Sequence, residues 1–169
     1  MDQHQRFQEI LAAHKGILIK VSCIYCRNEA DRSDLIQEIS IQIWKSLNKF
    51  NDKYKLSTWI YRIALNVAIS YYRKNSQRIN ATIPLEQVHE GSNDPAASDE
   101  EHKIKLLNQF INELNELDKA LMLLYLEEKS HAEIAAIFGM SVSNVGTRTG
   151  RIKEKLKNKF LMHKINYYE

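Results

Sequence analysis

Hydrophobic residues recur at spacings of three and four along most of this 169-residue chain, a pattern typical of amphipathic helices. The stripe between residues 7 and 21 predicts one or two helices. A second stripe, between residues 35 and 47, predicts a helix that ends near residue 49. Asp31 or Ser33 is expected to be its N-terminal cap, because a short polar side chain there satisfies free backbone donors.

The remaining stripes also have helical spacing. One predicts a helix over residues 57–78, capped by Ser57, and others predict helices near residues 100–113 and 118–127. No convincing period-two alternation marks a strand. The chain has only two Pro and five Gly, which argues against a turn-rich all-β architecture. The sequence therefore predicts an all-α protein.

The most informative segment, residues 130–148, has the pattern of two short helices joined by a tight turn. Ser130 and Glu133 have the spacing of a capping box, in which each side chain satisfies a free backbone donor of the other. Gly139 suits the left-handed conformation that ends a helix, and Ser141 is placed to cap the next one. The segment therefore predicts a helix-turn-helix.

The second helix of this motif has a polar face. Val142 and Val145 are expected to face the core. In helix-turn-helix proteins the N-terminal residues of the second helix enter the major groove. A helical hairpin with a solvated face is the alternative, but the caps, the turn glycine and the polar pattern agree with one another and favour DNA binding. The outward residues are the candidate DNA contacts, with Arg148 the candidate for a bidentate contact to guanine: Ser143, Asn144, Thr147, Arg148 and Arg151.

Charge is distributed unevenly along the chain. Residues 1–80 carry 13 Lys or Arg against 7 Asp or Glu, residues 81–101 carry 6 acidic residues and no basic one, and residues 102–169 carry 11 against 8. The middle segment also holds both prolines and little apolar content, which predicts a flexible acidic linker. The chain then divides into an N-terminal helical domain (1–80), the linker (81–101) and a C-terminal helix-turn-helix domain (102–169). Two basic domains point to an anionic partner that both touch.

The helix predicted over residues 57–78, with the loop before it, combines aromatic and basic side chains. Rings that stack on unpaired bases and cations that hold phosphates are what single-stranded nucleic acid requires. The simpler interpretation is that aromatic residues on a helix belong to the core, Trp59 in particular. The candidate contacts are Phe50, Lys53, Lys55, Trp59, Arg62, Asn66, Arg73 and Lys74.

Asp34 and Glu38 lie one helical turn apart and share a face with Gln37. Two carboxylates at that spacing suit acid–base catalysis, but no histidine or metal motif accompanies them. A solvated helix face is one alternative. The other is a docking face for basic residues of a partner protein.

Cys23 and Cys26 form a lone CxxC pair. A zinc ion needs two further ligands, and no second cysteine pair supplies them. We expect two small apolar residues on a packed helix in a reducing cytoplasm, and no metal or other cofactor. No apolar run approaches a membrane span and the N-terminus lacks an apolar signal core, so the sequence predicts a cytoplasmic protein without membrane insertion.

Taken in order, these motifs resemble those of group IV (extracytoplasmic-function) sigma factors of bacterial RNA polymerase, and the resemblance covers almost the whole chain. Residues 34–38, with Trp44 and Phe50, are similar to the segment that docks on the clamp helices of the polymerase β′ subunit. Residues 56–68 are similar to the segment for promoter melting and −10 recognition. Residues 114–124 and the helix-turn-helix are similar to the −35-binding domain.

The resemblance implies a transcription initiation subunit with no catalysis and no small-molecule substrate of its own. Its expected partners are core RNA polymerase, through the β′ clamp helices and the β subunit, promoter DNA, and an anti-sigma factor. The residues that the resemblance assigns to core binding are Asp34, Leu35, Gln37 and Glu38.

For DNA, the resemblance implies that Phe50 and Asn66 contact non-template bases at the −10 element. Residues 51–55 would help to form a pocket for a flipped base, which exchanges stacking in DNA for stacking in protein. Arg148 and Arg151 correspond to basic positions that contact −35 DNA.

The chain departs from the family pattern in the recognition helix. Gly146 stands where the family commonly has Arg, and Gly150 adds a second glycine. Each interior glycine costs roughly 1 kcal/mol relative to alanine. Asn51 and Asp52 also replace a loop that frequently contains glycine. We therefore expect preferences at −35 and −10 that differ from the family's usual ones.

Two other functional classes fit the sequence less well. A self-standing helix-turn-helix regulator, with the N-terminal domain as a sensor or dimerisation module, needs two-fold symmetry to read paired half-sites. No heptad seam is evident to supply the dimer. A nucleic-acid enzyme would need clustered metal-binding carboxylates or a nucleophile with its base, and the acidic residues here sit mainly on helix faces and in the linker.

Overall fold

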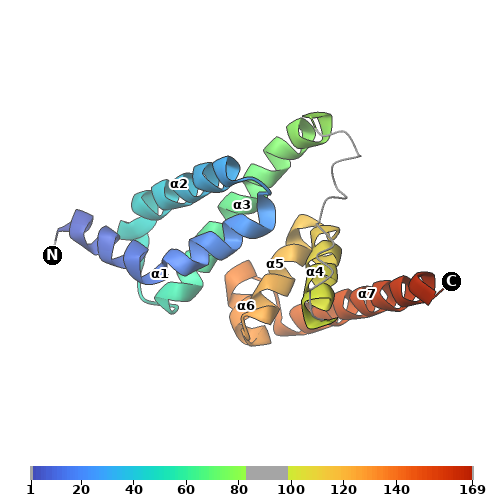
Figure 1. Ribbon diagram of the computed structural model, residues 1–169. Helices are drawn as coiled ribbons and strands as arrows, with labels where there is room; N and C mark the ends of the chain where they lie inside the picture. The colour runs from blue at the N-terminus through green and yellow to red at the C-terminus, as the bar shows by residue number, and fades with distance from the viewer. Residues whose placement is uncertain (1, 83–98, 169) are drawn as a thin grey trace.

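The computed structural model describes residues 2–82 and 99–168, and within them every regular element is a helix (Figure 1). The all-α prediction is confirmed. The elements, in chain order, are α1 (Gln3–Tyr25), α2 (Glu29–Ser46), the 3-10 turn η1 (Leu47–Lys49), α3 (Leu56–Thr82), α4 (Asp99–Asn112), α5 (Glu116–Leu126), α6 (His131–Phe138) and α7 (Val142–Tyr168).

Helices α1, α2 and α3 pack against one another to form the N-terminal domain. Their shared core contains the predicted stripe of α2, with Leu35, Ile39 and Ile43 fully buried, and Ile60 and Leu65 from α3. Burying one such side chain stabilises the fold by about 1.5–3 kcal/mol relative to leaving it exposed. The stripes therefore explain why these three helices associate.

Two of the expected helix caps were wrong. Helix α2 begins at Glu29, and the side chain of Asn28 accepts a hydrogen bond from the Asp31 backbone N–H at 2.7 Å, so neither Asp31 nor Ser33 is the cap. Acidic residues in the first turn of α2 favour this earlier start, because they complement the helix dipole. Helix α3 begins at Leu56, one residue before Ser57, and runs to Thr82 rather than ending near residue 78.

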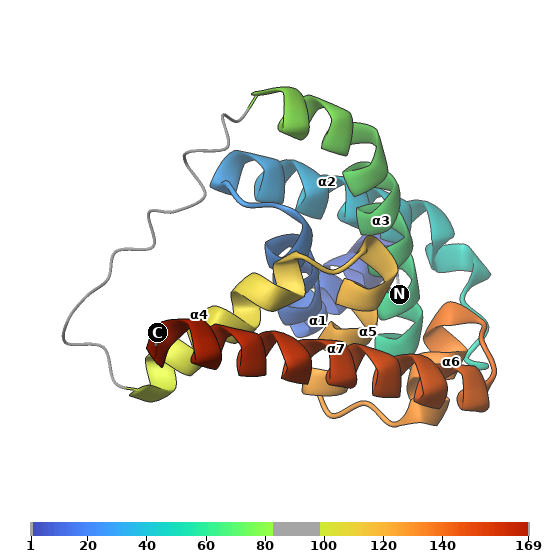
Figure 2. The ribbon, with the colours of Figure 1, turned by 90° about the vertical axis from the view of Figure 1, so that its right-hand side faces the viewer.

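The C-terminal domain is built around α5, whose residues are buried on nearly all sides. Leu121 and Leu124 meet Ile134 of α6 and Val145 of α7 in one core, and all four side chains are fully buried. Helix α7 is a single helix of 27 residues that extends past this core (Figure 2).

The predicted linker, residues 81–101, is helical at both of its ends. Helix α3 includes residues 81 and 82, and α4 includes residues 99–101, because the acidic start of α4 suits the positive end of a helix. The rest of the predicted linker lies outside the described residues.

The two domains contact each other directly. Helix α5 lies against α1 and α3, and α6 lies against the N-terminal end of α3 (Figures 1 and 2). Nothing in the sequence pattern predicted this contact. Across residues 2–82 and 99–168, no helix combines the length and the apolar character that crossing a membrane requires.

Candidate nucleic-acid interface

The helix-turn-helix forms as its capping residues predict. The Ser130 hydroxyl accepts from the Glu133 backbone N–H at 3.2 Å, and the Glu133 carboxylate accepts from the Ser130 backbone N–H at 2.9 Å. These hydrogen bonds hold the pKa of Glu133 below its usual value. Gly139 ends α6 in the left-handed conformation, with φ of 67°. Ser141 then caps α7 by accepting from the Asn144 N–H at 3.1 Å.

The inward face of α7 begins one turn later than predicted. Val145, Thr149, Ile152 and Leu156 are buried, but Val142 is 52% exposed. The prediction that Val142 faces the core was wrong, because this first residue of α7 lies one turn before the packed part of the helix. The first turn of α7, which contains Val142, does not pack against the core.

Four of the five candidate −35 residues are exposed, and one is already engaged within the protein. Arg148 is half-buried, and its Nε donates to Oδ1 of Asp118 in α5 at 2.8 Å. Its side chain is held against the domain, so part of its hydrogen-bonding capacity is used within the protein. The exposed candidates are Ser143, Asn144, Thr147 and Arg151.

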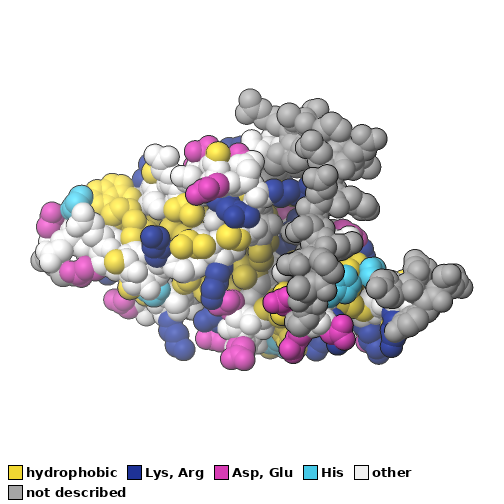
Figure 3. Space-filling model, in the orientation of Figure 1, with side chains coloured by type: hydrophobic (Ala, Val, Ile, Leu, Met, Phe, Trp, Pro, Cys, Tyr) yellow, Lys and Arg dark blue, Asp and Glu magenta, His cyan; other side chains and the backbone are white. Residues whose placement is uncertain are grey.

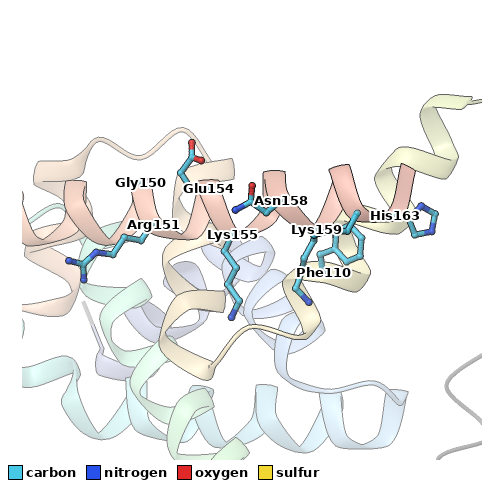
Figure 4. Close-up of a pocket in the computed structure, with 9 residues that line it drawn as sticks. Phe110, Gly150, Arg151, Glu154, Lys155, Asn158, Lys159 and His163 are labelled. Atoms are coloured by element: carbon cyan, nitrogen blue, oxygen red, sulfur yellow. The ribbon is translucent and has the colours of Figure 1, made fainter. Parts of the chain in front are cut away.

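A row of cations continues this surface along α7. Arg151, Lys155 and Lys159 project from one side of the helix at intervals of one turn, and they line an open groove between α7 and Phe110 of α4 (Figure 4). Lys159 lies over the Phe110 ring at 5.6 Å and contacts Glu113. Evenly spaced cations on one helix side suit the phosphates of a nucleic acid backbone.

Three of the four candidate core-binding residues are exposed on α2. Asp34, Gln37 and Glu38 face solvent, whereas Leu35 is fully buried among α1, α2 and α3. The predicted contact of Leu35 with a partner does not fit this structure, because its side chain belongs to the core stripe. Figure 3 shows hydrophobic side chains gathered over the same domain, with basic side chains among them.

Glu38 shares a groove with candidate DNA contacts. The groove between α2 and α3 is lined by Glu38 and Ile41 on one side and by Asn66 and Lys74 on the other. The structure thus brings a candidate polymerase contact next to two candidate −10 contacts. Sequence spacing alone did not predict this proximity.

The remaining −10 candidates are spread over the loop before α3 and along α3 itself. The rings of Phe50 and Trp59 are in tilted contact, with 5.1 Å between their centroids and 48° between their planes, and Trp59 is half-buried, so Trp59 contributes to packing as the simpler interpretation expected. Asp52 in the same loop has a positive φ of 54°. Lys53 and Arg62 are exposed, while Lys55 and Arg73 make ion pairs with the C-terminal domain.

The CxxC pair is divided between surface and core. Cys23 is exposed, whereas Cys26 is buried at the end of α1, where burial raises its thiol pKa to about 11. The expectation of two packed cysteines was correct only for Cys26. Within the part of the chain that the structure describes, no group of three or more His, Cys, Asp or Glu side chains is arranged to hold a metal ion.

The chain matches two protein families, one in each domain. Residues 10–78 match the family described as Sigma-70 region 2, and residues 104–156 match the family described as Sigma-70, region 4. The chain is 31% identical over 141 residues to the ECF RNA polymerase sigma-E factor of Escherichia coli strain K12, covering 76% of this chain and 73% of that protein. It is 26% identical over 162 residues to the RNA polymerase sigma factor CnrH of Cupriavidus metallidurans, covering 89% and 84%.

Two solved structures have folds similar to that of this chain. The structure of CnrH in complex with the cytosolic domain of CnrY has a TM-score of 0.66 at 21% identity, covering 93% of this chain and 88% of that one. The sigma factor RpoE, in complex with the anti-sigma factor NepR from Bartonella quintana, has a TM-score of 0.62 at 19% identity, covering 92% and 94%. At these identities the likeness concerns the fold.

Proposed function

Because this chain belongs to the family of extracytoplasmic-function RNA polymerase sigma factors, we propose that it binds core polymerase in the cytoplasm, directs it to particular promoters and opens the DNA at the −10 element. It does so as an initiation subunit without catalysis of its own. One observation carries the proposal. Both matched regions occur in one chain, in the order found in the family, and each has exposed candidate contacts. The same observation favours this function over a self-standing regulator.

Core polymerase binds the exposed face of α2. Asp34, Gln37 and Glu38 present two carboxylates and an amide to solvent, which suits basic and hydrogen-bonding groups of a partner helix. The groove beside Glu38 adds the half-exposed Ile41 as an apolar contact. Leu35 supports this face from the core and does not touch the partner.

The loop before α3 and α3 itself open the promoter DNA. Phe50 lies beside Trp59, and residues 51–55 next to them form the side of a pocket for a flipped base. Arg62, Asn66 and Lys74 extend along the exposed side of α3, where they hold the unpaired strand by its phosphates and base edges.

Recognition at −35 falls to α7. Ser143, Asn144 and Thr147 reach base edges or phosphates from the first turns, and Arg151 with the lysines beyond it neutralises backbone charge. The Nε of Arg148 donates a hydrogen bond to Asp118, so only the other N–H groups of its guanidinium are available to DNA. Gly146 places no side chain where the family's usual contact stands, which supports a different −35 sequence.

An anti-sigma factor is a further proposed partner. The two solved structures named above contain sigma factors together with CnrY and NepR, and their folds cover most of this chain. Such a partner would control when the proposed polymerase and promoter contacts become available.

Run-off transcription tests the proposal. Purified chain is added to core polymerase with a pool of genomic promoter fragments, and we expect discrete transcripts that core polymerase alone does not make. The double variant Asp34→Arg/Glu38→Arg should lose core binding in a pull-down while keeping its helical circular dichroism. The matched control Glu9→Arg/Glu100→Arg, at two exposed acidic positions elsewhere, should bind as the wild type does. Absence of any promoter-dependent transcript would refute the sigma-factor function.

A further inference from the structure

An acidic surface on the C-terminal domain faces basic residues of the N-terminal domain. Its carboxylates belong to Glu116 and Glu127, at the two ends of α5, and to Glu133 in α6. Each one pairs with a cation of the other domain. The pairs are Arg73 Nε with Glu116 Oε1 at 2.7 Å, Lys20 Nζ with Glu127 Oε2 at 2.5 Å, and Lys55 Nζ with Glu133 Oε1 at 3.8 Å.

Aromatic residues of the N-terminal domain complete the contact. The Tyr25 hydroxyl donates to the backbone carbonyl of Glu116 at 2.5 Å, and Tyr25 is only 4% exposed. Lys119 lies over the Tyr72 ring at 5.0 Å, and Lys129 lies over the Tyr61 ring at 5.6 Å. Burial and the neighbouring Glu127 carboxylate raise the pKa of Tyr61 to about 12. Hydrogen bonds, ion pairs and cation–π contacts therefore all cross between the domains.

Two of these cations are candidate promoter contacts. Arg73 and Lys55 are among the −10 contacts that the sequence predicts, and here their partners are carboxylates of the same chain. A carboxylate and a phosphate offer a guanidinium or an ammonium the same kind of acceptor. The same cation cannot serve both acceptors fully.

We propose that the free chain is self-inhibited: the acidic surface formed by Glu116, Glu127 and Glu133 occupies the basic surface of the N-terminal domain and competes with DNA phosphates for Arg73 and Lys55. This inference rests on the proposed function for its consequence, since it assumes that these cations hold promoter DNA. The closed arrangement itself depends only on the contacts above.

The contacts between the two domains are weak enough for the domains to separate. The cation side chains of the three pairs are 50–79% exposed, so each pair contributes little and is weakened further by salt. Lys119 is only 4% exposed, and its pKa is lowered by burial and by Arg27 of the N-terminal domain. Burying this charge opposes closure, because the ammonium regains water when the domains separate. A stronger anion such as DNA can therefore displace the acidic surface.

Compactness in solution tests the closed arrangement. Small-angle scattering of the full chain in about 0.01 M NaCl, where the Debye length is about 30 Å and screening is weak, should give a smaller radius of gyration than the variant Glu116→Lys/Glu127→Lys. The control Glu9→Lys/Glu100→Lys has the same change in net charge at exposed positions outside the three pairs, and it should stay compact. The charge exchange Arg73→Glu/Glu116→Arg should restore compactness relative to Glu116→Arg alone. A wild-type radius equal to that of the Glu116→Lys/Glu127→Lys variant would overturn closure.

Competition is tested with a fluorescein-labelled single-stranded oligonucleotide of mixed sequence. Glu116→Lys/Glu127→Lys should bind it about fivefold more tightly than the control of equal charge, the change expected when Arg73 loses its competing carboxylate and the Lys20–Glu127 pair no longer helps to hold the domains closed. An equal gain in both variants would mean that net charge alone is responsible, and it would overturn the competition. Failure of the transcription assay would remove the proposed function and leave the scattering result standing, so the two failures are distinguishable.

Discussion

Arg148 of the recognition helix is tied to Asp118 of α5 by a hydrogen bond of 2.8 Å from its Nε to Oδ1. The other carboxylate oxygen of Asp118 accepts from the side chain of Asn115, the residue that caps α5. One carboxylate therefore connects the start of α5 to the middle of the DNA-binding face of α7. We therefore expect this connection to help fix the angle at which α7 is presented.

The first prediction concerns the Asp118–Arg148 pair. Asp118→Ala and Arg148→Ala should each destabilise the full chain by about 1–2 kcal/mol, since a charge-assisted, partly buried hydrogen bond is lost. The double variant should be less destabilised than the sum, with a coupling near 1 kcal/mol. Urea denaturation followed by circular dichroism measures the free energy of unfolding of the two single variants and of the double variant.

The same variants separate positioning from direct contact. Arg148→Ala should weaken binding to the promoter's own −35 sequence by about 1–3 kcal/mol. If Arg148 acts by positioning α7, Asp118→Ala should reproduce most of that loss although Asp118 cannot itself attract phosphate. Unchanged affinity in Asp118→Ala would refute positioning and leave a direct contact of Arg148 with DNA.

The helix-turn-helix could be predicted in detail because its signals are local. Ser130 with Glu133, Gly139, and Ser141 each act within a few residues, and all behave in the structure as their spacing indicates. The cap of α2 was predicted wrongly because three short polar residues compete for that role, and the first turn that follows Asn28 contains two acidic residues, Glu29 and Asp31. Local rules fix helix types better than helix ends.

Contacts between distant residues could not be predicted from the pattern. The partners of Arg148 and Arg73 lie 30 and 43 residues away in the chain, and no periodicity relates them. The sequence identified Glu133 only as a capping-box residue and did not single out Glu116. Their position opposite the basic N-terminal domain depends on how two independently patterned domains pack, which a one-dimensional pattern does not contain. Leu35, which the sequence assigned to polymerase binding, is buried because the motif of residues 34–38 includes both faces of α2.

The second prediction concerns the glycines of the C-terminal domain. Gly150→Ala should stabilise the chain by up to about 1 kcal/mol, because a methyl group there meets no atom within 4 Å and alanine favours the helix. Gly139→Ala should instead destabilise by about 1–2 kcal/mol, because its φ of 67° is costly for a residue with a side chain. Thermal unfolding of both variants measures these two changes in stability. A loss of stability in Gly150→Ala would contradict the open space at that position.

The third prediction concerns the two cysteines. In the native chain at about pH 8, iodoacetamide should modify Cys23 and leave Cys26 unmodified, because Cys26 is buried and its thiol pKa is raised to about 11. Mass spectrometry of peptides from the quenched reaction assigns the site. Cys23→Ser should abolish rapid modification, and denaturation should expose Cys26. Equal rates at both thiols in the folded chain would show that the end of α1 opens freely.

The fourth prediction is a pH dependence of the capping box. Glu133 accepts from the backbone N–H and the hydroxyl of Ser130, and these hydrogen bonds lower its pKa in the folded state. A lowered pKa means that the ionised carboxylate stabilises the fold at neutral pH, and that this contribution disappears as the pH falls through the folded-state pKa. Wild type should therefore unfold at a higher temperature than Glu133→Gln at pH 7, and the gap should narrow as the pH falls below the usual pKa of a glutamate side chain.

Ser130→Ala supplies the complementary arm of this test. It should cost about 1 kcal/mol at pH 7, because α6 loses its cap, and it should also reduce the pH dependence, because Glu133 loses the hydroxyl donor. Lys55 lies 3.8 Å from the same carboxylate, so Lys55→Ala is the control for the ion pair between the domains. If Lys55→Ala removes the pH dependence as fully as Glu133→Gln does, the ion pair is its source and the assignment to the capping box is wrong.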